Sequence, residues 1–213
     1  MSPNAMQGSD PIQIVFFVAV LMFSVIAHEV SHGYMAQYLG DSTARFAGRL
    51  TMNPLKHIDP IGSILVPLVM VLSHTGFVFG WAKPVPYNPY NLRDQKWGDA
   101  KVAIAGPLTN FGIALIFAII LRVESGLSGS MLELMHVIVI VNIVLGVFNL
   151  VPIPPLDGSK VLMNLLPFRY RYIGDYLERY SLVFFLIFVL FLWPYVSPVV
   201  NAIYYLFVGM PLY

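Results

Sequence analysis

The chain has 213 residues, of which 58% are hydrophobic and only 11% are charged, with a formal net charge of +1. Soluble domains typically carry about 25% charged residues, so this composition and a mean hydropathy of +0.74 indicate an integral membrane protein, with one domain at this length. The near-zero net charge indicates no nucleic-acid partner. The absence of cysteine excludes disulfides, thiolate nucleophiles and cysteine metal ligands.

Four apolar segments are candidates for membrane-crossing helices, which need about 20 mostly apolar residues. They cover 12–39, 102–121, 131–150 and 182–195. The first lacks both a preceding Lys or Arg and a convincing cleavage site, so we expect a retained span rather than a signal peptide. The last continues past Pro194 and Pro198 into 199–210, either as a bent continuation or as a short returning helix. The sequence therefore predicts an all-α polytopic membrane protein with about four to five transmembrane helices.

The connection between the first two long helices has a different composition. Residues 61–72 are apolar but short for a span, and the following GFVFGWAKPVPYNPYN (76–91) is rich in Gly, Pro and aromatic residues. This composition favours strands, turns and loops over helix. We expect 61–80 to form a re-entrant, β-like loop that enters the membrane and returns. Residues 78–81 are predicted to be either a strand with an open edge or part of a plain amphipathic loop.

The Lys and Arg residues indicate how the chain is oriented. If 61–80 returns without crossing, every basic residue except Arg122 lies on the side where the first helix ends. The positive-inside rule makes that side cytoplasmic. The N-terminus, with no Lys or Arg before Arg45, then lies on the opposite side.

The sequence HEVSH (28–32) places ionisable groups inside the first predicted helix. His28 and His32 lie one turn apart on one helix face, and Glu29 follows the first of them. In the pattern H-E-x-x-H the two histidines bind zinc and the glutamate handles the proton of a metal-bound water. Each ionisable side chain deep in a bilayer costs about 2.5–3.5 kcal/mol, which a metal ion would offset. A proton or ion pathway is the alternative.

A catalytic zinc usually has three protein ligands, so one ligand is still needed. The candidates are His57, His74, His136 and the carboxylates. Asp157 lies in NLVPIPPLDGSKVL (149–162), where the prolines prevent a regular helix and open the backbone. It also lies near the same membrane side as His28 and His32. These features favour Asp157 over His57, although Asp157 could instead only cap the following helix.

Three separated motifs resemble the site-2 protease family of intramembrane zinc metalloproteases. They are HEVSHGYMA (28–36), AGPLTN (105–110) and FNLVPIPPLDG (148–158). Two further stretches, GRLTMNPLKHIDPIG (48–62) and GWAKPVPYNP (80–89), are similar to the compact bacterial branch without a PDZ domain. The resemblance covers about 20–166.

The resemblance implies a ligand set and a catalytic group. It implies that His28, His32 and Asp157 bind one Zn²⁺ per chain and that Glu29 is the catalytic residue that activates zinc-bound water. It also suggests that Asn149 is catalytic, holding the substrate backbone or the developing oxyanion. An interhelical hydrogen bond is the alternative for Asn149.

The implied activity is hydrolysis of peptide bonds in or near transmembrane segments of substrate proteins or remnant signal peptides. The expected location is the lipid bilayer of a bacterial plasma membrane, with the active site towards the cytoplasm. A single domain over 1–213 would hold a catalytic core at about 12–166 and C-terminal helices at 175–213. The open strand edge would receive the unwound substrate. The alternatives are a metal-binding membrane transporter and a non-catalytic, helix-binding scaffold, and the sequence gives no oligomeric state.

The remaining polar residues are assigned structural roles. Gly106 and Asn110 are expected to serve close helix packing, and Asn142 an internal hydrogen bond. For His57 a loop hydrogen bond is favoured over a gating or polarising role near the metal. Two histidines without a supporting pattern are expected at the surface or at an interface: His74 and His136.

Overall fold

The computed structural model describes residues 11–66, 69, 82–123, 126 and 128–211, and within these residues it is helical without strands. The long helices are α1 (Pro11–Tyr38), α4 (Gly98–Val123) and α5 (Gly129–Asn149), followed by the run α8 (Ser181–Ile187), η6 (Phe188–Leu192) and α9 (Trp193–Val208). Among the described residues, four helices are long and apolar enough to cross a membrane: Ile12–Tyr38, Gly98–Val123, Gly129–Leu150 and Ser181–Val208. The predicted all-α polytopic fold is therefore confirmed. The strand predicted at 78–81 lies outside the described residues.

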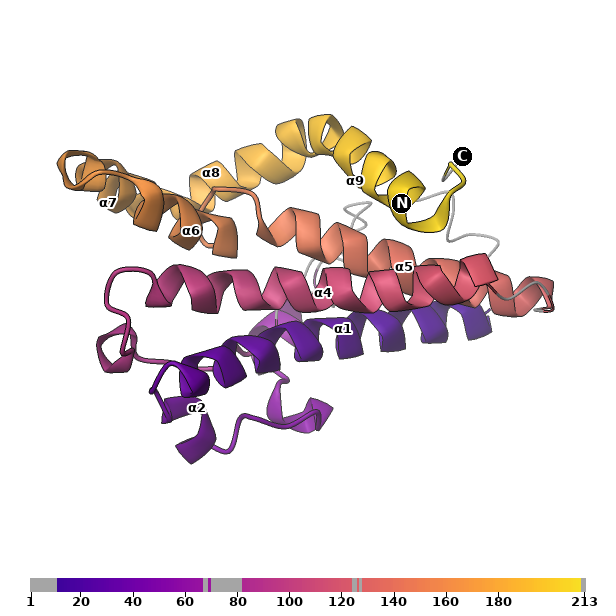
Figure 1. Ribbon diagram of the computed structural model, residues 1–213, viewed down its shortest axis with the longest axis horizontal. Helices are drawn as coiled ribbons and strands as arrows, with labels where there is room; N and C mark the ends of the chain where they lie inside the picture. Colours follow the sequence, from indigo (N-terminus) through magenta and orange to yellow (C-terminus); the bar gives the residue numbers. More distant parts are fainter. Residues whose placement is uncertain (1–10, 67–68, 70–81, 124–125, 127, 212–213) are drawn as a thin grey trace.

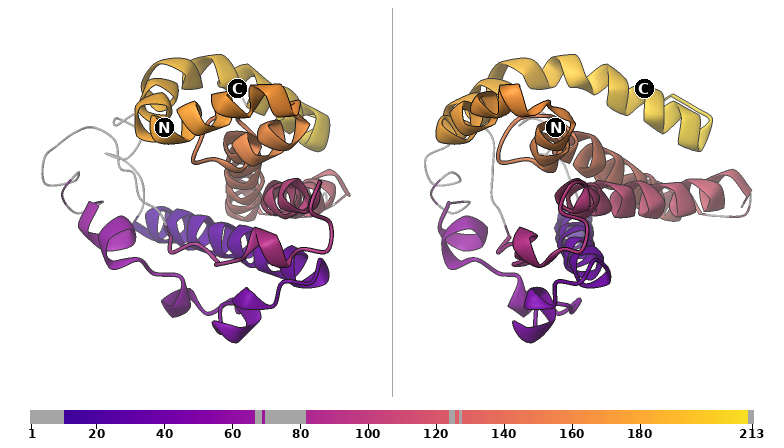
Figure 2. Two further views of the ribbon diagram at one scale, coloured as in Figure 1. Left: turned by 90° about the vertical axis from the view of Figure 1, so that its left-hand side faces the viewer. Right: turned by 60° about the vertical axis from the view of Figure 1, so that its left-hand side comes forward.

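Helix α4 is the centre of the bundle. It packs against α1 on one side and against α5 and α9 on the other, as Figures 1 and 2 show from three directions. Many of its buried positions are small, including Ala103, Gly106, Ala114 and Ala118. In a lipid bilayer the hydrophobic effect does not drive helices together. Membrane helices instead pack through small residues, which let their backbones approach closely. The buried cluster between α4, α5 and α9 is built on this contact.

The last span is a bent continuation rather than a returning helix. The π-helical turn η6 leads directly into α9, where Pro194 occupies the first turn and Pro198 lies inside. At the far end Gly209 adopts a left-handed φ of 86° and ends the helix. The Arg122 Nη2 donates to Leu206 O at 2.6 Å, which places a cation against the carbonyl end of α9.

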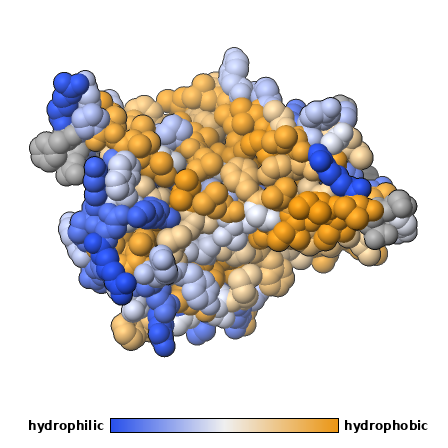
Figure 3. All heavy atoms as spheres, in the orientation of Figure 1, coloured by the Kyte–Doolittle hydropathy of each residue, from blue (hydrophilic) through white to orange (hydrophobic). Residues whose placement is uncertain are grey.

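Both ends of the α1–α4 connection lie at one end of the bundle. The Arg93 N–H donates to Leu39 O at 2.7 Å, and Leu39, Leu92 and Val102 share one buried cluster. The chain therefore returns to the end it left, as predicted, although 67–68 and 70–81 lie outside the described residues. The described part of the connection includes α2 (Thr43–Phe46), η2 (Pro54–Lys56), the π-helical turn η3 (Pro60–Leu65) and η4 (Pro89–Asn91). Hydrophilic residues gather mainly at this end, and apolar residues cover much of the spanning helices (Figure 3).

Asp41 ties the end of α1 to this connection. Its side chain is fully buried, at 0% exposure, and accepts hydrogen bonds from the Thr43 N–H and hydroxyl, the Asn88 N–H and the Asn91 Nδ2. Burial alone would raise the pKa of Asp41, but these donors outweigh it and hold the pKa below its ordinary value. The ionised carboxylate therefore joins the end of α1 and the start of α2 to residues 88–91.

Replacing this carboxylate tests its structural role. We expect Asp41→Ala to lower the free energy of unfolding by about 1–3 kcal/mol, because buried donors lose their acceptor. Since the folded-state pKa is lowered, the Asp41 contribution is complete above the unfolded pKa of about 3.9 and is lost as pH falls through the folded value. Thermal unfolding in detergent at pH 7 and at lower pH measures both effects. Asp175→Asn, at an exposed carboxylate, is the control; equal stability of Asp41→Ala and wild type at pH 7 would contradict this role.

Candidate metal centre

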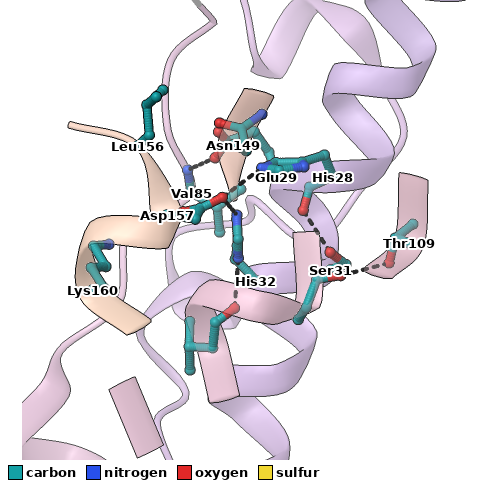
Figure 4. Close-up of polar contacts among 12 residues, drawn as sticks. His28, Glu29, Ser31, His32, Val85, Thr109, Asn149, Leu156, Asp157 and Lys160 are labelled. Atoms are coloured by element: carbon teal, nitrogen blue, oxygen red, sulfur yellow. Dashed lines mark hydrogen bonds and ion pairs between the residues drawn. The ribbon is translucent and has the colours of Figure 1, made fainter. Parts of the chain in front are cut away.

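Two histidines of α1 and the first residue of α6 (Asp157–Leu165) meet beside α4. The Nε2 atoms of His28 and His32 lie 3.0 and 3.2 Å from the same Asp157 Oδ2 (Figure 4). One ligand atom from each residue lies within 4.8 Å of the others, a spacing that could hold a metal ion. The structure thus brings together the three residues expected from the sequence.

The outer nitrogens of both imidazoles are held by acceptors. His28 Nδ1 lies 2.6 Å from Asn110 Oδ1, and His32 Nδ1 lies 2.7 Å from Val102 O. An acceptor at Nδ1 places the ring proton there and leaves the Nε2 lone pair facing Asp157. This is the tautomer in which histidine binds metal through Nε2, so the donor set fits a metal ion.

A buried amide network fixes the orientation of Asn110. Its Nδ2 donates to Asn142 Oδ1 at 2.9 Å and to Ser24 O at 3.3 Å, which turns Oδ1 towards His28. The Asn142 Nδ2 in turn donates to Ser24 Oγ at 2.9 Å. Both asparagines are fully buried. The packing role expected for Asn110 was therefore incomplete, because this residue also orients a candidate ligand.

Gly106 allows α4 to touch the candidate ligands. A Cβ atom at this position would lie 2.5 Å from His28 Cε1 and 2.5 Å from His32 Nε2. Any larger residue would therefore displace the imidazole rings. Close packing was expected of Gly106, and the surface it packs against is the candidate site itself.

The turn between α5 and α6 delivers Asp157. A Cβ atom on Gly158 would lie 2.1 Å from Leu150 O, so the start of α6 presses against the end of α5. The residue at the N-cap of α6 is Leu156, and the Asp157 carboxylate faces His28 and His32 instead. The alternative that Asp157 only caps this helix is therefore wrong.

Glu29 lies next in sequence to His28, and its carboxylate contacts a different partner. Its Oε2 accepts a hydrogen bond from the Val85 N–H at 3.0 Å (Figure 4). Val85 belongs to the stretch 82–88, which has no regular secondary structure. The polar side chains of α1 thus have different partners. The two imidazoles face Asp157, and the Glu29 carboxylate is held by the connection between α1 and α4.

A second polar chain joins this stretch to α6. The Tyr87 hydroxyl donates to Asp99 Oδ1, and the Lys160 Nζ donates to the Tyr87 oxygen at 3.0 Å. Burial and then the bond to Asp99 raise the pKa of Tyr87. The sequence analysis missed this chain, because no spacing rule relates residues on three separate elements.

The other candidates have hydrogen-bond partners of their own or are not described. The Asn149 Nδ2 donates to Leu145 O at 3.0 Å, a bond within α5 rather than the interhelical bond considered for it, and its contact with a substrate stays a prediction. His57 is 2% exposed and its Nε2 donates to Thr51 O, which confirms the favoured loop hydrogen bond. His136 is paired with the Tyr204 hydroxyl. His74 lies outside the described residues.

These features define a class of protein: polytopic helical membrane proteins with an H-E-x-x-H metal centre completed by a distant carboxylate. The model of peptidase family M50 matches residues 16–129 and 124–192. The chain belongs to this family, the family of the site-2 proteases, which confirms the resemblance found in the sequence.

Two relatives illustrate the similarity. "Putative zinc metalloprotease YwhC" of Bacillus subtilis (strain 168) is 36% identical, over 88% of this chain and 86% of its own. "Zinc metalloprotease MJ0392" of Methanocaldococcus jannaschii is 26% identical, over 75% of this chain but only 36% of its own. No solved structure matches this chain significantly.

The contact of Gly106 with both imidazoles leads to a prediction about metal affinity. We expect Gly106→Ala to weaken Zn²⁺ binding by about 10- to 100-fold, a loss typical when the surroundings of ligands are disturbed. Competition with a chromophoric chelator in detergent measures the affinity. Gly112→Ala is the matched control, because its added Cβ would meet nothing within 4 Å. Equal affinity in the two variants would show that the close contact does not constrain the ligands.

Proposed function

We propose that this protein hydrolyses peptide bonds in or near transmembrane segments of other proteins. Membership of peptidase family M50 and relatives named as zinc metalloproteases make the chain a zinc metalloprotease. Its four long apolar helices make it an integral membrane protein. The observation that carries the proposal is the convergence of His28, His32 and Asp157 where α1, α6 and α4 meet.

We assign these three side chains as zinc ligands. Two imidazoles and one carboxylate form the kind of three-ligand set that leaves a fourth position open in catalytic zinc sites. The hydrogen bonds at both Nδ1 atoms support this assignment, because they leave each Nε2 free to coordinate. When bound, zinc supplies Lewis-acid chemistry, lowering the pKa of water towards about 7 and polarising a carbonyl.

We assign proton transfer to Glu29. The Val85 N–H binds Oε2, and the other oxygen, Oε1, takes a proton from the attacking water. The water oxygen forms a bond to the scissile carbonyl carbon, and Glu29 then returns the proton to the amide nitrogen as the C–N bond breaks. The Glu29 carboxylate is held by the Val85 N–H, which suits it to this separate task.

The remaining parts of the proposal concern the substrate and the membrane. Asn149 would hold the substrate backbone or the developing oxyanion after giving up its bond to Leu145 O. The substrates would be transmembrane proteins or remnant signal peptides. Because six of the twelve Lys and Arg residues lie in the connection between α1 and α4, at the end where α1 stops, we propose that the site faces the cytoplasm of a bacterial plasma membrane. One domain, 1–213, would contain the whole apparatus.

Glu29→Gln separates catalysis from metal binding. We expect this variant to retain zinc but to lose cleavage by about 10²–10⁴-fold, because only proton transfer needs the carboxylate. Zinc content by elemental analysis and cleavage of a model membrane-segment substrate in proteoliposomes measure the two properties. Asp157→Ala should lose zinc as well as activity.

Glu133→Gln, at an exposed carboxylate near the start of α5, is the control and should behave as wild type. Unchanged cleavage by Glu29→Gln would eliminate the proposed mechanism. Full zinc content in Asp157→Ala would remove that residue from the ligand set. A wild-type protein that binds zinc and membrane segments without cutting them would favour the scaffold or transporter alternatives.

A further inference from the structure

The stretch Pro84-Val85-Pro86 presents a single backbone donor to α1. Proline has no N–H, so Val85 supplies the only N–H of these three residues. That N–H donates to Glu29 Oε2 at 3.0 Å. The two flanking prolines also restrict the backbone, which limits the directions in which this donor can point.

Val85 is fixed against the helix that carries Glu29. Its side chain is only 5% exposed. A Cβ atom on Gly33, about one turn beyond Glu29, would lie 2.7 Å from Val85 Cγ1 and 2.5 Å from Leu50 Cδ2. The absence of a side chain at Gly33 therefore sets how closely the stretch approaches α1, and hence how the Val85 N–H reaches the carboxylate.

Arg49 holds the opposite side of the same peptide group. Its Nη2 donates to Lys83 O at 2.6 Å and to Pro84 O at 3.2 Å. Pro84 O and the Val85 N–H belong to one planar peptide unit, so fixing the oxygen also fixes the direction of the N–H. A hydrogen bond from a cation to the carbonyl also polarises the unit and strengthens its N–H as a donor.

The burial of Arg49 is costly and needs a reason. The residue is 8% exposed, and within the described part of the chain no carboxylate lies at ion-pair distance from it. A buried cation paired only with carbonyls is unfavourable compared with one paired with a carboxylate. The stretch it binds is anchored independently, because the Lys83 N–H donates to His57 O at 2.8 Å. Arg49 is therefore not needed simply to attach this stretch.

We propose that Arg49 is a positioning residue that acts through the Pro84–Val85 peptide on the Glu29 carboxylate. Its guanidinium orients the peptide, the Val85 N–H binds Oε2, and Oε1 is thereby aimed at the attacking water. The inference rests on the proposed function for the role of Glu29. It assigns a task to Arg49, in the sequence GRLTMNP, that the metal centre does not require.

The kinetic test compares variants that keep or remove the donor. Val85→Pro removes the N–H, whereas Val85→Ala keeps it, and both lose the valine side chain. We expect Val85→Pro to lower kcat by about 10- to 100-fold with zinc content and KM near those of wild type, because a misplaced catalytic group costs rate rather than binding. Val85→Ala loses the packing but keeps the donor, so we expect its kcat to lie between those of wild type and Val85→Pro. Equal kcat values for the two variants would overturn the proposal.

Arg49 provides a second pair of variants, which tests the proposal if Val85→Pro does not fold. We expect Arg49→Met to lower kcat by about 10-fold or more at unchanged zinc content and KM, and Arg49→Lys to recover part of the loss, because an ammonium can still donate to a carbonyl. A purely structural role would instead reduce zinc content or raise KM. Reduced zinc content or a raised KM in Arg49→Met would overturn the proposal, and so would a wild-type kcat in that variant.

Hydrogen exchange tests the contact without cleavage. In Glu29→Ala the Val85 amide loses its acceptor, and we expect its exchange to accelerate by about 10-fold or more. Glu29→Gln retains a side-chain oxygen and should keep protection. The Asn88 amide, held by Asp41, is the internal control and should be unchanged in both.

This readout separates the two proposals. A wild-type protein that cuts no membrane segment would contradict the proposed function, while the exchange of the Val85 amide would still report on its bond to Glu29. Val85 exchange that is insensitive to Glu29→Ala would overturn the positioning role even in an active protease.

Discussion

The contact between the imidazoles of α1 and the backbone of α4 constrains the rest of the molecule. An unpaired polar group in an apolar bundle costs several kcal/mol, so each nitrogen of His28 and His32 needs a partner. One nitrogen of each ring faces Asp157, and the other binds Asn110 Oδ1 or Val102 O on α4. These partners fix both the register and the separation of the two helices, and only a residue without a side chain, Gly106, fits between the rings and the α4 axis.

The remaining elements follow from this pair of helices. Asn110 needs Asn142 to turn its amide, which sets the position of α5 against α4. The end of α5 then determines where Asp157 appears, because Gly158 lets α6 start against Leu150 O. The spanning helices thus act as a rigid frame in which three side chains from distant parts of the sequence share one location. Such a frame suits metal chemistry, because residues on packed helices hold a site more precisely than residues on loops do.

The features that depend on local sequence rules could be predicted. The contacts that depend on how two helices are placed relative to each other could not. The H-E-x-x-H spacing, the length of the apolar runs and the proline break before Asp157 are all local; the predicted spans agree with the structure, and the three candidate ligands lie together in it. The bond between His28 and Asn110 depends on helix register, which uniformly apolar helices do not reveal because no face is marked by polarity. The sequence likewise did not distinguish a bent last helix from a returning one. The structure does, because the π-helical turn η6 leads directly into α9.

The connection between α1 and α4 is built differently from the frame and complements it. Asp41, Arg49 and His57 are all buried, and each binds main-chain groups of the connection. A loop that only joined two spans would leave its backbone to water and would not bury two charged side chains. Arg49 and Asp41 hold the stretch 82–88 through Lys83 O, Pro84 O and the Asn88 N–H, and Glu29 is the group on α1 that this stretch holds. The candidate metal ligands and the Glu29 carboxylate beside them are therefore positioned by separate parts of the fold, so that a change in the connection can alter one without moving the other.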